Sequence, residues 1–492
     1  MRHALVPLVI ALACGCTTTV QNPVTGQPER TVMDERSEVQ EGAKEHQAVL
    51  AEYGTVQDPR VQAYVTELGR RLARQSERAQ LDWHFTVLDS PEVNAFALPG
   101  GYVYVTRGIM AYMDSEADLA GVMGHEIGHV TARHGAQRAT KQQTAGLGVL
   151  AATVLGAILE GRGVSGAGQV ASQISQTAAA GYIAHYSRDQ ELQADRLGAE
   201  YLSRAGYNPR NMVDVIQLLR YQDQFAAEVA RSEGRTAQQG PSWLASHPSN
   251  EQRLHDITSI AANYRGSYGD DGRARYQQLI NGMAFGETRE QGVTRGRNFY
   301  HEPLGFAITA PAGWKIQNEP NAVALVNPDS TAGLVLQMVP EKAGSSAEDI
   351  LRNVIKPEQG RTERYSINGM PATHFAGTRR NEQGRAEPVE ATVVSGPSGR
   401  NYLLAYSGAD AASLQRAHGQ MREAEASFRP LSAADRNAAR PWTVRTVPYP
   451  RGGFAELARQ SPLPHAERHL RLLNGFYGGG EPAPGQLVKT VQ

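Results

Sequence analysis

Two histidines four residues apart constrain this chain more than any other feature. They are His125 and His129 in the segment His-Glu-Ile-Gly-His, with Glu126 directly after the first. If the segment is helical, a spacing of about one turn places both imidazoles on the same face. Two imidazoles on one face can bind a zinc ion, and the glutamate between them can act on water at the metal. The pattern predicts a metal-dependent hydrolase, provided that further ligands exist elsewhere in the chain.

A pair of acidic residues later in the chain supplies candidate ligands. A hydrolytic zinc site needs three protein ligands and one open position. Glu191 and Asp195 are four residues apart in a predicted helix, so their carboxylates share one face. We expect one carboxylate to bind the metal and the other to accept the outer N–H of a ligand histidine. His134 lies about 140° around the helix from His129, so we favour Glu191 as the third ligand and expect His134 to be structural.

The expected chemistry makes Glu126 the general base. It would take a proton from water at the metal and pass that proton to the leaving amine. The oxyanion of the transition state needs a hydrogen-bond donor. His247 is the first candidate, and Tyr182 and Tyr186 are alternatives. His247 could instead cap a helix at the surface, or sit on the metal, block the water position and keep the enzyme latent.

An extended substrate peptide needs a partner strand beside the metal. Asn94, Ala95 and Phe96 open a predicted hairpin whose turn is Pro99-Gly100-Gly101. Because an edge strand offers backbone hydrogen bonds to a peptide of any sequence, we expect these three residues to bind substrate. The alternative is an ordinary sheet edge.

The N-terminus has the pattern of a targeting segment. A basic start at Arg2 is followed by an apolar run over residues 4–13 and then by Cys14-Gly15-Cys16. This resembles a bacterial lipoprotein processing site. We favour lipidation of Cys16, with Cys14 or a plain secretory signal as alternatives. By the same resemblance, Thr17 in place of aspartate after the cysteine implies the periplasmic face of the outer membrane.

The rest of the sequence divides the chain into segments of different composition. Hydrophobic residues make up 40% and charged residues 20%, which is ordinary for globular protein. Between the two halves of the metal site, residues 144–184 are apolar and glycine-rich. We expect a packed helical pair, a mobile lid or a hairpin that dips into the membrane surface. The fold class expected is α+β: a mainly helical protease domain with a small mixed sheet, then a small α+β domain and a short module. The predicted boundaries are a signal peptide at 1–16, a tether at 17–36, the protease at 37–290, the α+β domain at 292–430 and the C-terminal module at 434–492.

These motifs resemble metallopeptidase family 48. The resemblance rests on residues 125–129, on 187–195, on the Asn94 strand and on the segment from His247 to Arg253. The family includes HtpX, the CAAX prenyl endopeptidases and BepA-like periplasmic quality-control proteases. It implies a gluzincin fold in which an active-site helix packs on a mixed sheet.

The resemblance also implies roles for single residues. His125, His129 and Glu191 would hold one zinc ion per chain, and Glu126 would be the base. Asp195 would support a ligand and pair with Arg253, and His247 would lie on the oxyanion side. Residues 292–430 resemble the photosystem protein PsbP. Residues 472–475 and 484–489 resemble the end of a LysM repeat, a peptidoglycan-binding module.

The sequence thus predicts a lipid-anchored periplasmic zinc metalloendopeptidase. Its expected partners are unfolded or misassembled envelope polypeptides, the membrane and, through the last segment, peptidoglycan. The net charge of −1 gives no reason to expect nucleic acid. Two alternatives remain open: a latent protease that acts as a chaperone-like binding protein, and a lipoprotein whose main task is to tether peptidoglycan.

Overall fold

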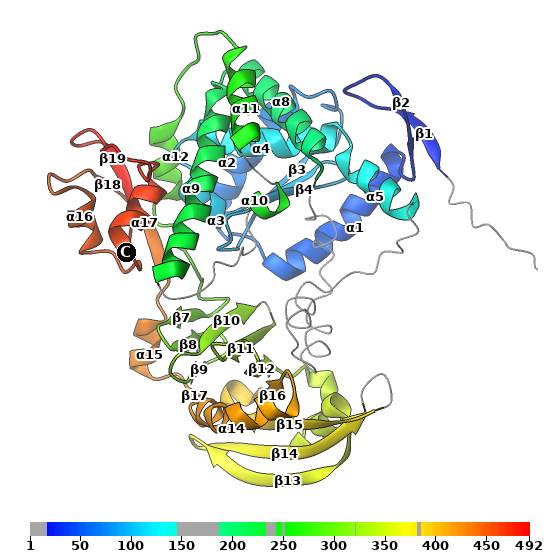
Figure 1. Cartoon of the computed structure of the whole chain (residues 1–492), viewed down its shortest axis with the longest axis vertical. Helices are drawn as coiled ribbons and strands as arrows, with labels where there is room; N and C mark the ends of the chain where they lie inside the picture. Colours follow the sequence, from blue (N-terminus) through cyan, green and yellow to red (C-terminus); the bar gives the residue numbers. More distant parts are fainter. Residues whose placement is uncertain (1–16, 145–185, 233–242, 248–250, 320, 381–384) are drawn as a thin grey trace, which may run out of the picture.

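The computed structural model describes residues 17–144, 186–232, 243–247, 251–319, 321–380 and 385–492 (Figure 1). The predictions for Cys14, Cys16 and Tyr182, and nearly all of the expected 144–184 helical pair, lie outside these residues. Within the described part of the chain, no helix combines the length and the apolarity that a membrane span requires.

The N-terminal half of the chain is mainly helical around a small mixed sheet. The sheet has the order β3-β5-β4, with β3 parallel and β4 antiparallel to the central strand. Its strands are β3 His84–Leu88, β4 Ala95–Leu98 and β5 Tyr102–Thr106. The helices are α1 Glu35–Tyr53, α2 Pro59–Ala73, α3 Arg107–Tyr112, α4 Glu116–Thr131, α5 His134–Thr144, α8 Arg188–Arg204, α9 Arg210–Ser232, α10 Trp243–Ser246, α11 Glu251–Ala262 and α12 Arg273–Ile280.

Helix α4 is buried along its whole length. It begins with a capping box, in which Ser115 and Asp118 each accept a hydrogen bond from the other's backbone N–H. Small residues let α8 approach it closely, because a Cβ atom at Gly128 would lie only 2.9 Å from the carbonyl oxygen of Ala194. This close packing brings the acidic face of α8 to the histidine face of α4.

The sequence pattern predicts one helix over residues 115–134, but the helix is shorter in the structure. It ends at Thr131 because Arg133 adopts the left-handed conformation, with φ of 61°. His134 then starts α5 in a new direction. The predicted tether contains a β-hairpin of β1 Thr18–Gln21 and β2 Pro28–Thr31, and the Asn22 amide donates to the carbonyl of Ala132, 3.3 Å away.

A sheet-rich region follows and has its own core (Figure 1, lower half). A seven-stranded antiparallel sheet has the order β10-β11-β12-β16-β15-β14-β13, and a smaller one has the order β17-β9-β8-β7. The strands are β7 Val293–Arg295, β8 Asn298–His301, β9 Phe306–Thr309, β10 Lys315–Glu319, β11 Ala322–Val326, β12 Ala332–Met338, β13 Pro357–Ile367, β14 Met370–Arg380, β15 Ala386–Ser395, β16 Asn401–Gly408 and β17 Arg429–Pro430. The helical segments are η2 Glu341–Ala343, α13 Ala347–Ile350, η3 Leu351–Ile355, η4 Pro397–Gly399 and α14 Ala411–Ala426.

The last segment returns to the helical half of the molecule. Helix α15 Ala433–Ala438 still packs on β8 of the sheet-rich region. The elements after it are β18 Trp442–Pro448, α16 Gly453–Ala458, α17 Ala466–Leu473 and β19 Leu487–Val491. Strand β18 pairs with β19 and with β6 Ala284–Phe285, and the apolar side chains of the segment join the same core as those of α2, α4 and α9. Residues 442–491 therefore share a core with the expected protease domain, while the boundaries predicted for the domains and the LysM-like interpretation remain predictions.

Lys489 of β19 is fully buried in this contact. Its ammonium donates to the carbonyl oxygens of Ala111, Tyr112 and Met113 at 3.1, 3.2 and 2.7 Å. These are carbonyls at the end of α3, which have no partner within the helix. Burial lowers the pKa of Lys489 to about 8, against the opposing effect of Asp114. The C-terminal strand thus caps a helix of the helical half.

Candidate metal centre

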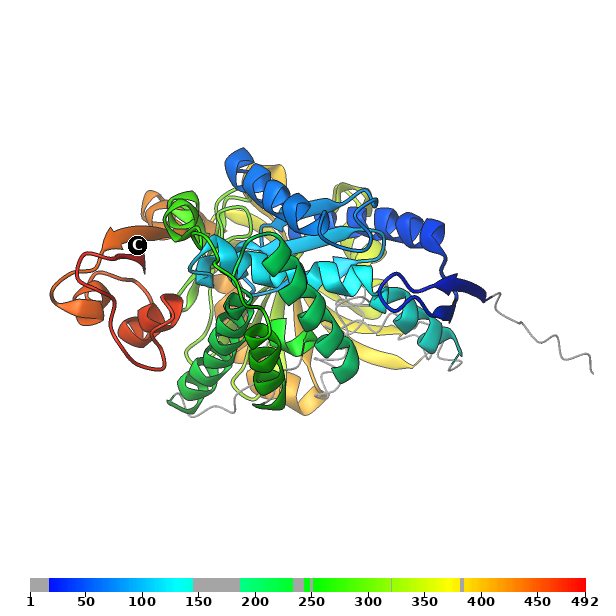
Figure 2. The ribbon, with the colours of Figure 1, turned by 90° about the horizontal axis from the view of Figure 1, so that it is seen from above.

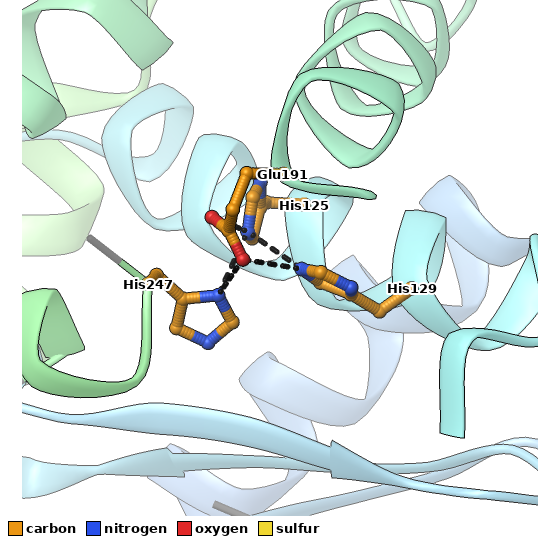
Figure 3. A group of neighbouring side chains, drawn as sticks. All are labelled: His125, His129, Glu191 and His247. Atoms are coloured by element: carbon orange, nitrogen blue, oxygen red, sulfur yellow. Dashed lines mark hydrogen bonds and ion pairs between the residues drawn. The ribbon is translucent and has the colours of Figure 1, made fainter. Parts of the chain in front are cut away.

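Four side chains converge at the contact between α4 and α8 (Figure 3). They are His125 and His129 of α4, Glu191 of α8 and His247, directly after α10. One nitrogen or oxygen atom of each lies within 4.8 Å of those of the other three, and all four side chains are buried. In the part of the chain that the structure describes, this is the only such group of histidines, cysteines and carboxylates.

The two histidines of α4 turn the same nitrogen toward the centre. Their Nε2 atoms are 3.0 Å apart, and each lies 3.5 Å from a carboxylate oxygen of Glu191. The Nδ1 atom of His125 lies 2.8 Å from Asp195, and that of His129 lies 2.8 Å from Nδ1 of His134. With their outer nitrogens engaged, both rings face inward.

This arrangement fits a metal ion. A neutral imidazole that donates from Nδ1 carries its lone pair on Nε2. Two such lone pairs and a carboxylate, brought together out of water, repel one another unless a cation lies between them. Two imidazoles and one carboxylate form a donor set found in catalytic metal sites. The residues of this site therefore fit the group that the sequence predicted.

Arg253 supports both acidic residues. Its guanidinium makes two 2.9 Å hydrogen bonds to Asp195, and its Nη1 lies 2.8 Å from Glu191 and donates to the His247 carbonyl at 2.9 Å. Burial disfavours ionisation of Asp195, but Arg253 outweighs it and lowers the carboxyl pKa. Burial is outweighed in the same way at Glu191, where His247 and Arg253 hold the pKa well below its usual value. Both acids are therefore carboxylates at neutral pH.

Glu126 points toward the same centre. Its Oε1 accepts a hydrogen bond from the Trp243 indole at 3.0 Å and lies 3.5 Å from Nε2 of His247. Its Oε2 is buried and has no hydrogen-bond partner among the described residues. A buried carboxylate oxygen without a hydrogen-bond partner costs free energy. The place of Oε2 beside the four donor side chains suits a base that acts on a molecule bound there.

His247 lies within the donor group. Its Nδ1 is 3.2 Å from Nε2 of His125 and 3.0 Å from Glu191. Burial opposes protonation of this ring, but the carboxylates of Glu191 and Glu126 outweigh it and raise the pKa. This is the position expected for a histidine that sits on the metal, which was the alternative to a donor for the oxyanion.

Sequence comparison identifies the region that carries this centre. Residues 59–261 match the pattern that defines peptidase family M48. They form an M48 metallopeptidase domain. The chain is 29% identical over 254 residues to the beta-barrel assembly-enhancing protease of Yersinia pestis, which covers 48% of this chain and 50% of that protein. It is 31% identical over 210 residues to the Escherichia coli K12 protein of the same name, covering 43% of this chain and 41% of that protein.

A mitochondrial relative matches the same domain. The metalloendopeptidase OMA1 of Bos taurus is 28% identical over 184 residues, which are 37% of this chain and 33% of that protein. The chain thus spans about half or less of the length of these relatives. A solved structure of cyanobacterial PsbP from Synechocystis sp. PCC 6803 aligns with 28% of this chain and 98% of its own, at 13% identity and a TM-score of 0.20. The PsbP-like interpretation of residues 292–430 remains a prediction.

Two contacts of the M48 centre were missed by sequence reasoning. Trp243 holds Glu126, and its ring stacks on His247 with centroids 4.7 Å apart. The four-residue spacing of Trp243 and His247 was the signal in the sequence that could have predicted their contact. Tyr186, an alternative for the oxyanion, stacks on His129 at 3.9 Å, and burial raises its pKa to about 12.

The predicted substrate strand lies at the edge of the M48 sheet. The order β3-β5-β4 leaves one side of β4 without a partner strand among the described residues. Ala95 packs in the core shared with α4, whereas Phe96 packs on Tyr104 on the opposite face, with ring centroids 4.8 Å apart. Trp243 donates its backbone N–H to the carbonyl of Val93 at 2.9 Å, so the segment before Asn94 is tied to the metal centre.

Proposed function

We propose that the chain is a zinc metalloendopeptidase. The observation that carries the proposal is the inward convergence of two Nε2 atoms and the Glu191 carboxylate, with Glu126 beside them. Membership of residues 59–261 in family M48 supports it. His125, His129 and Glu191 hold the ion, and Asp195 and Arg253 orient them. Zinc is favoured because this borderline-soft ion is commonly bound by two imidazoles and a carboxylate in a four-coordinate site.

The residues around the ion divide the chemistry. Zinc, when bound, acidifies water and polarises the scissile carbonyl. Glu126 accepts the proton of the attacking water at its carboxylate and delivers it to the leaving amine. We expect the free edge of β4, in the segment of Asn94, Ala95 and Phe96, to hold the substrate peptide as an added strand. The backbone N–H and carbonyl of Asn94 itself are bonded to Thr106 and do not belong to that edge.

We infer that His247 closes the site at rest. Catalytic zinc sites keep an open position, whereas structural sites are fully ligated. Nδ1 of His247 is close enough to the other donors to fill that position. Hydrolysis then requires His247 to move away, after which its imidazole can donate a hydrogen bond to the oxyanion. The second candidate function, a latent protease that binds polypeptides in the manner of a chaperone, is favoured by this same placement.

The substrates that we propose are misfolded or misassembled proteins of the bacterial envelope. Two relatives are named beta-barrel assembly-enhancing proteases, which supports this class. Lipidation at Cys16 would place the chain on the periplasmic face of the outer membrane. Fractionation of cells that express wild type and Cys16→Ala tests the anchor, and release of the variant from the membrane fraction is the expected result.

The decisive experiment compares the chain from Thr17 onward with its Glu126→Gln variant. We expect about one zinc per chain in both proteins and casein cleavage in the wild type alone. His247→Ala removes both the closing side chain and the donor to the oxyanion, so it should cleave faster than wild type where closure limits turnover and more slowly where the oxyanion hydrogen bond does. Zinc in both proteins with no cleavage in any of the three would support the chaperone-like function, and no zinc in either would refute the ligand assignment.

Peptidoglycan binding by residues 434–492 is the third possibility. Because residues 442–491 share a core with the M48 domain, the full chain from Thr17 is the proper material. Sedimentation with purified sacculi tests it, and a chain that stays in the supernatant contradicts it.

A further inference from the structure

The outer partner of His129 is unusual. The Nδ1 atom of His125 faces a carboxylate, but that of His129 faces another imidazole nitrogen, Nδ1 of His134, at 2.8 Å. Both rings of this second pair are buried, and His134 has no exposed surface. A short contact between two ring nitrogens out of water requires one to donate and the other to accept. Which of them donates is decided by the groups at the far ends of the pair.

The neighbours fix both tautomers. Nε2 of His129 faces the metal donors, so its lone pair lies there and its proton lies on Nδ1. Nδ1 of His134 must then accept, which places the proton of His134 on its Nε2. That nitrogen lies 2.9 Å from Oε1 of Gln193 in α8, and an amide oxygen can only accept. The hydrogen bonds therefore run in one direction, from His129 to His134 to Gln193.

We propose that His134 is a positioning residue for the metal centre, a neutral acceptor that fixes the tautomer and ring orientation of His129. This inference rests on the proposed zinc function. It gives His134 the part that Asp195 has for His125, but without adding a negative charge. Replacing the group that hydrogen-bonds the outer nitrogen of a ligand histidine typically lowers metal affinity 10- to 100-fold.

The backbone break after α4 is what brings His134 into contact. On one continuous helix His134 would point away from His129, but the left-handed Arg133 redirects the chain. Arg133 is held in turn, because it donates to Glu38 of α1 at 3.1 Å and to the carbonyl of Met33 at 2.6 Å. A non-glycine residue at positive φ persists only where its surroundings enforce it, commonly at functional sites.

Three substitutions at one position test the proposal. In His134→Asn the side-chain oxygen can take the place of Nδ1 and accept from His129. In His134→Gln the amide reaches the place of Nε2 and leaves the Nδ1 place to a methylene group. His134→Leu removes both polar atoms. His301→Leu, at a partly buried histidine of the sheet-rich region, is the matched control.

The readouts are zinc affinity in competition with a chromophoric chelator, and the visible spectrum of the cobalt-substituted protein. We expect affinity 10- to 100-fold lower in His134→Leu and His134→Gln, with altered cobalt bands. We expect His134→Asn to stay within about threefold of wild type and His301→Leu to match it. A purely structural role would not favour asparagine over glutamine.

Equal affinity in all variants, or equal loss in Asn and Gln, would overturn the inference. If His134→Leu fails to fold, the comparison of Asn with Gln still decides. Wild type that binds no zinc would instead refute the proposed function together with the inference. If wild type binds zinc and His134→Gln binds it with the same affinity, only the role of His134 is refuted.

Discussion

Trp243 connects Glu126, the proposed general base, to His247, which we infer closes the site. Its indole N–H donates to Glu126 at 3.0 Å, its ring stacks on His247, and the Arg253 guanidinium lies 5.2 Å from its ring centroid. A rigid aromatic ring in such a position fixes several charged groups at once. The orientation of Glu126 therefore depends on a residue outside the metal ligands.

Replacing Trp243 by phenylalanine should lower kcat about 10- to 100-fold, which is the worth of one hydrogen bond to a charged group. The ring stack on His247 is kept, so zinc content should not change. Steady-state kinetics on a peptide substrate give kcat and KM. Trp83→Phe is the control, because the Trp83 indole donates to the Arg78 carbonyl, and its kcat should equal that of wild type.

The sequence predicted the residues of the centre better than the contacts between them. The spacing of His125, His129, Glu191 and Asp195 was enough to place them on facing helices, because helical geometry alone decides which side chains share a face. The contact of His134 could not be predicted, since it depends on a single left-handed residue that no helical pattern reveals. The roles assigned to these residues stay predictions until the variants are measured.

At the scale of elements, the start of the metal-binding helix is held by a charged cluster. Glu116 at the first turn of α4 accepts hydrogen bonds from Arg71 and Tyr64 of α2, from Tyr207, and from Arg275 of α12. Burial disfavours its charge, but these donors outweigh it and lower the pKa of Glu116 to about 2. One carboxylate thus joins α4 to α2, α12 and the turn after α8.

The Glu116 carboxylate should stabilise the fold in a pH-dependent manner. Its folded pKa is depressed from an ordinary value of 4.5, so its contribution is complete above pH 4.5 and is lost as pH falls toward 2. Glu116→Gln should lower the free energy of unfolding by about 1–2 kcal/mol at pH 7 and by less at pH 3.

Urea unfolding at the two pH values measures the difference between wild type and this variant. Glu67→Gln, at an exposed position of α2, should have no comparable effect at either pH. A wild-type advantage that persists undiminished at pH 3 would contradict the role given to the carboxylate.

Helix starts were easier to predict than helix ends. Ser115 and the acidic first turn of α4 form a local signal that the structure reproduces as a capping box. The end of α4 depends on Arg133, whose conformation is set by distant partners in α1 and in the loop before it. The local sequence around Arg133 therefore does not predict where α4 ends.

At the scale of the whole molecule, the two ends of the described chain lie on opposite sides. The N-terminal hairpin β1–β2 and the C-terminal segment are at opposite ends of the helical half in both views (Figures 1 and 2). The hairpin contacts the turn after α4, and the C-terminal segment contacts α3 and α9. The M48 domain is therefore held from both sides by segments outside residues 59–261.

Leu470 tests whether the C-terminal segment unfolds together with the M48 domain. It is fully buried in the shared core, and Leu470→Ala should cost about 2–5 kcal/mol. Far-UV circular dichroism and release of zinc to a chelator should report one transition in urea, shifted equally for both. Leu487→Ala at an exposed position of β19 should change stability by less than about 0.5 kcal/mol. Separate transitions would mean an independent module.

Sequence patterns predict an order of regions along the chain but do not predict how the regions pack. The strands and helices of residues 292–430 follow alternations that are visible locally. The place of residues 442–491 is decided by apolar partners far back in the chain. From the sequence alone, Lys489 would be expected at the surface. Only the structure shows that its ammonium contacts the carbonyl groups at the end of α3.

The position of Lys489 also orders events during synthesis. It meets Ala111 across a sequence separation of 378 residues. A ribosome makes the chain from its amino end and releases α4 with both proposed ligand histidines early. The core beside that helix stays open until β19 has emerged, since β18, β19 and α17 supply part of it. A chain without β19 thus carries His125, Glu126 and His129 beside an unfinished core, and we expect the alignment that hydrolysis needs to arise only once the C-terminal strand has joined that core.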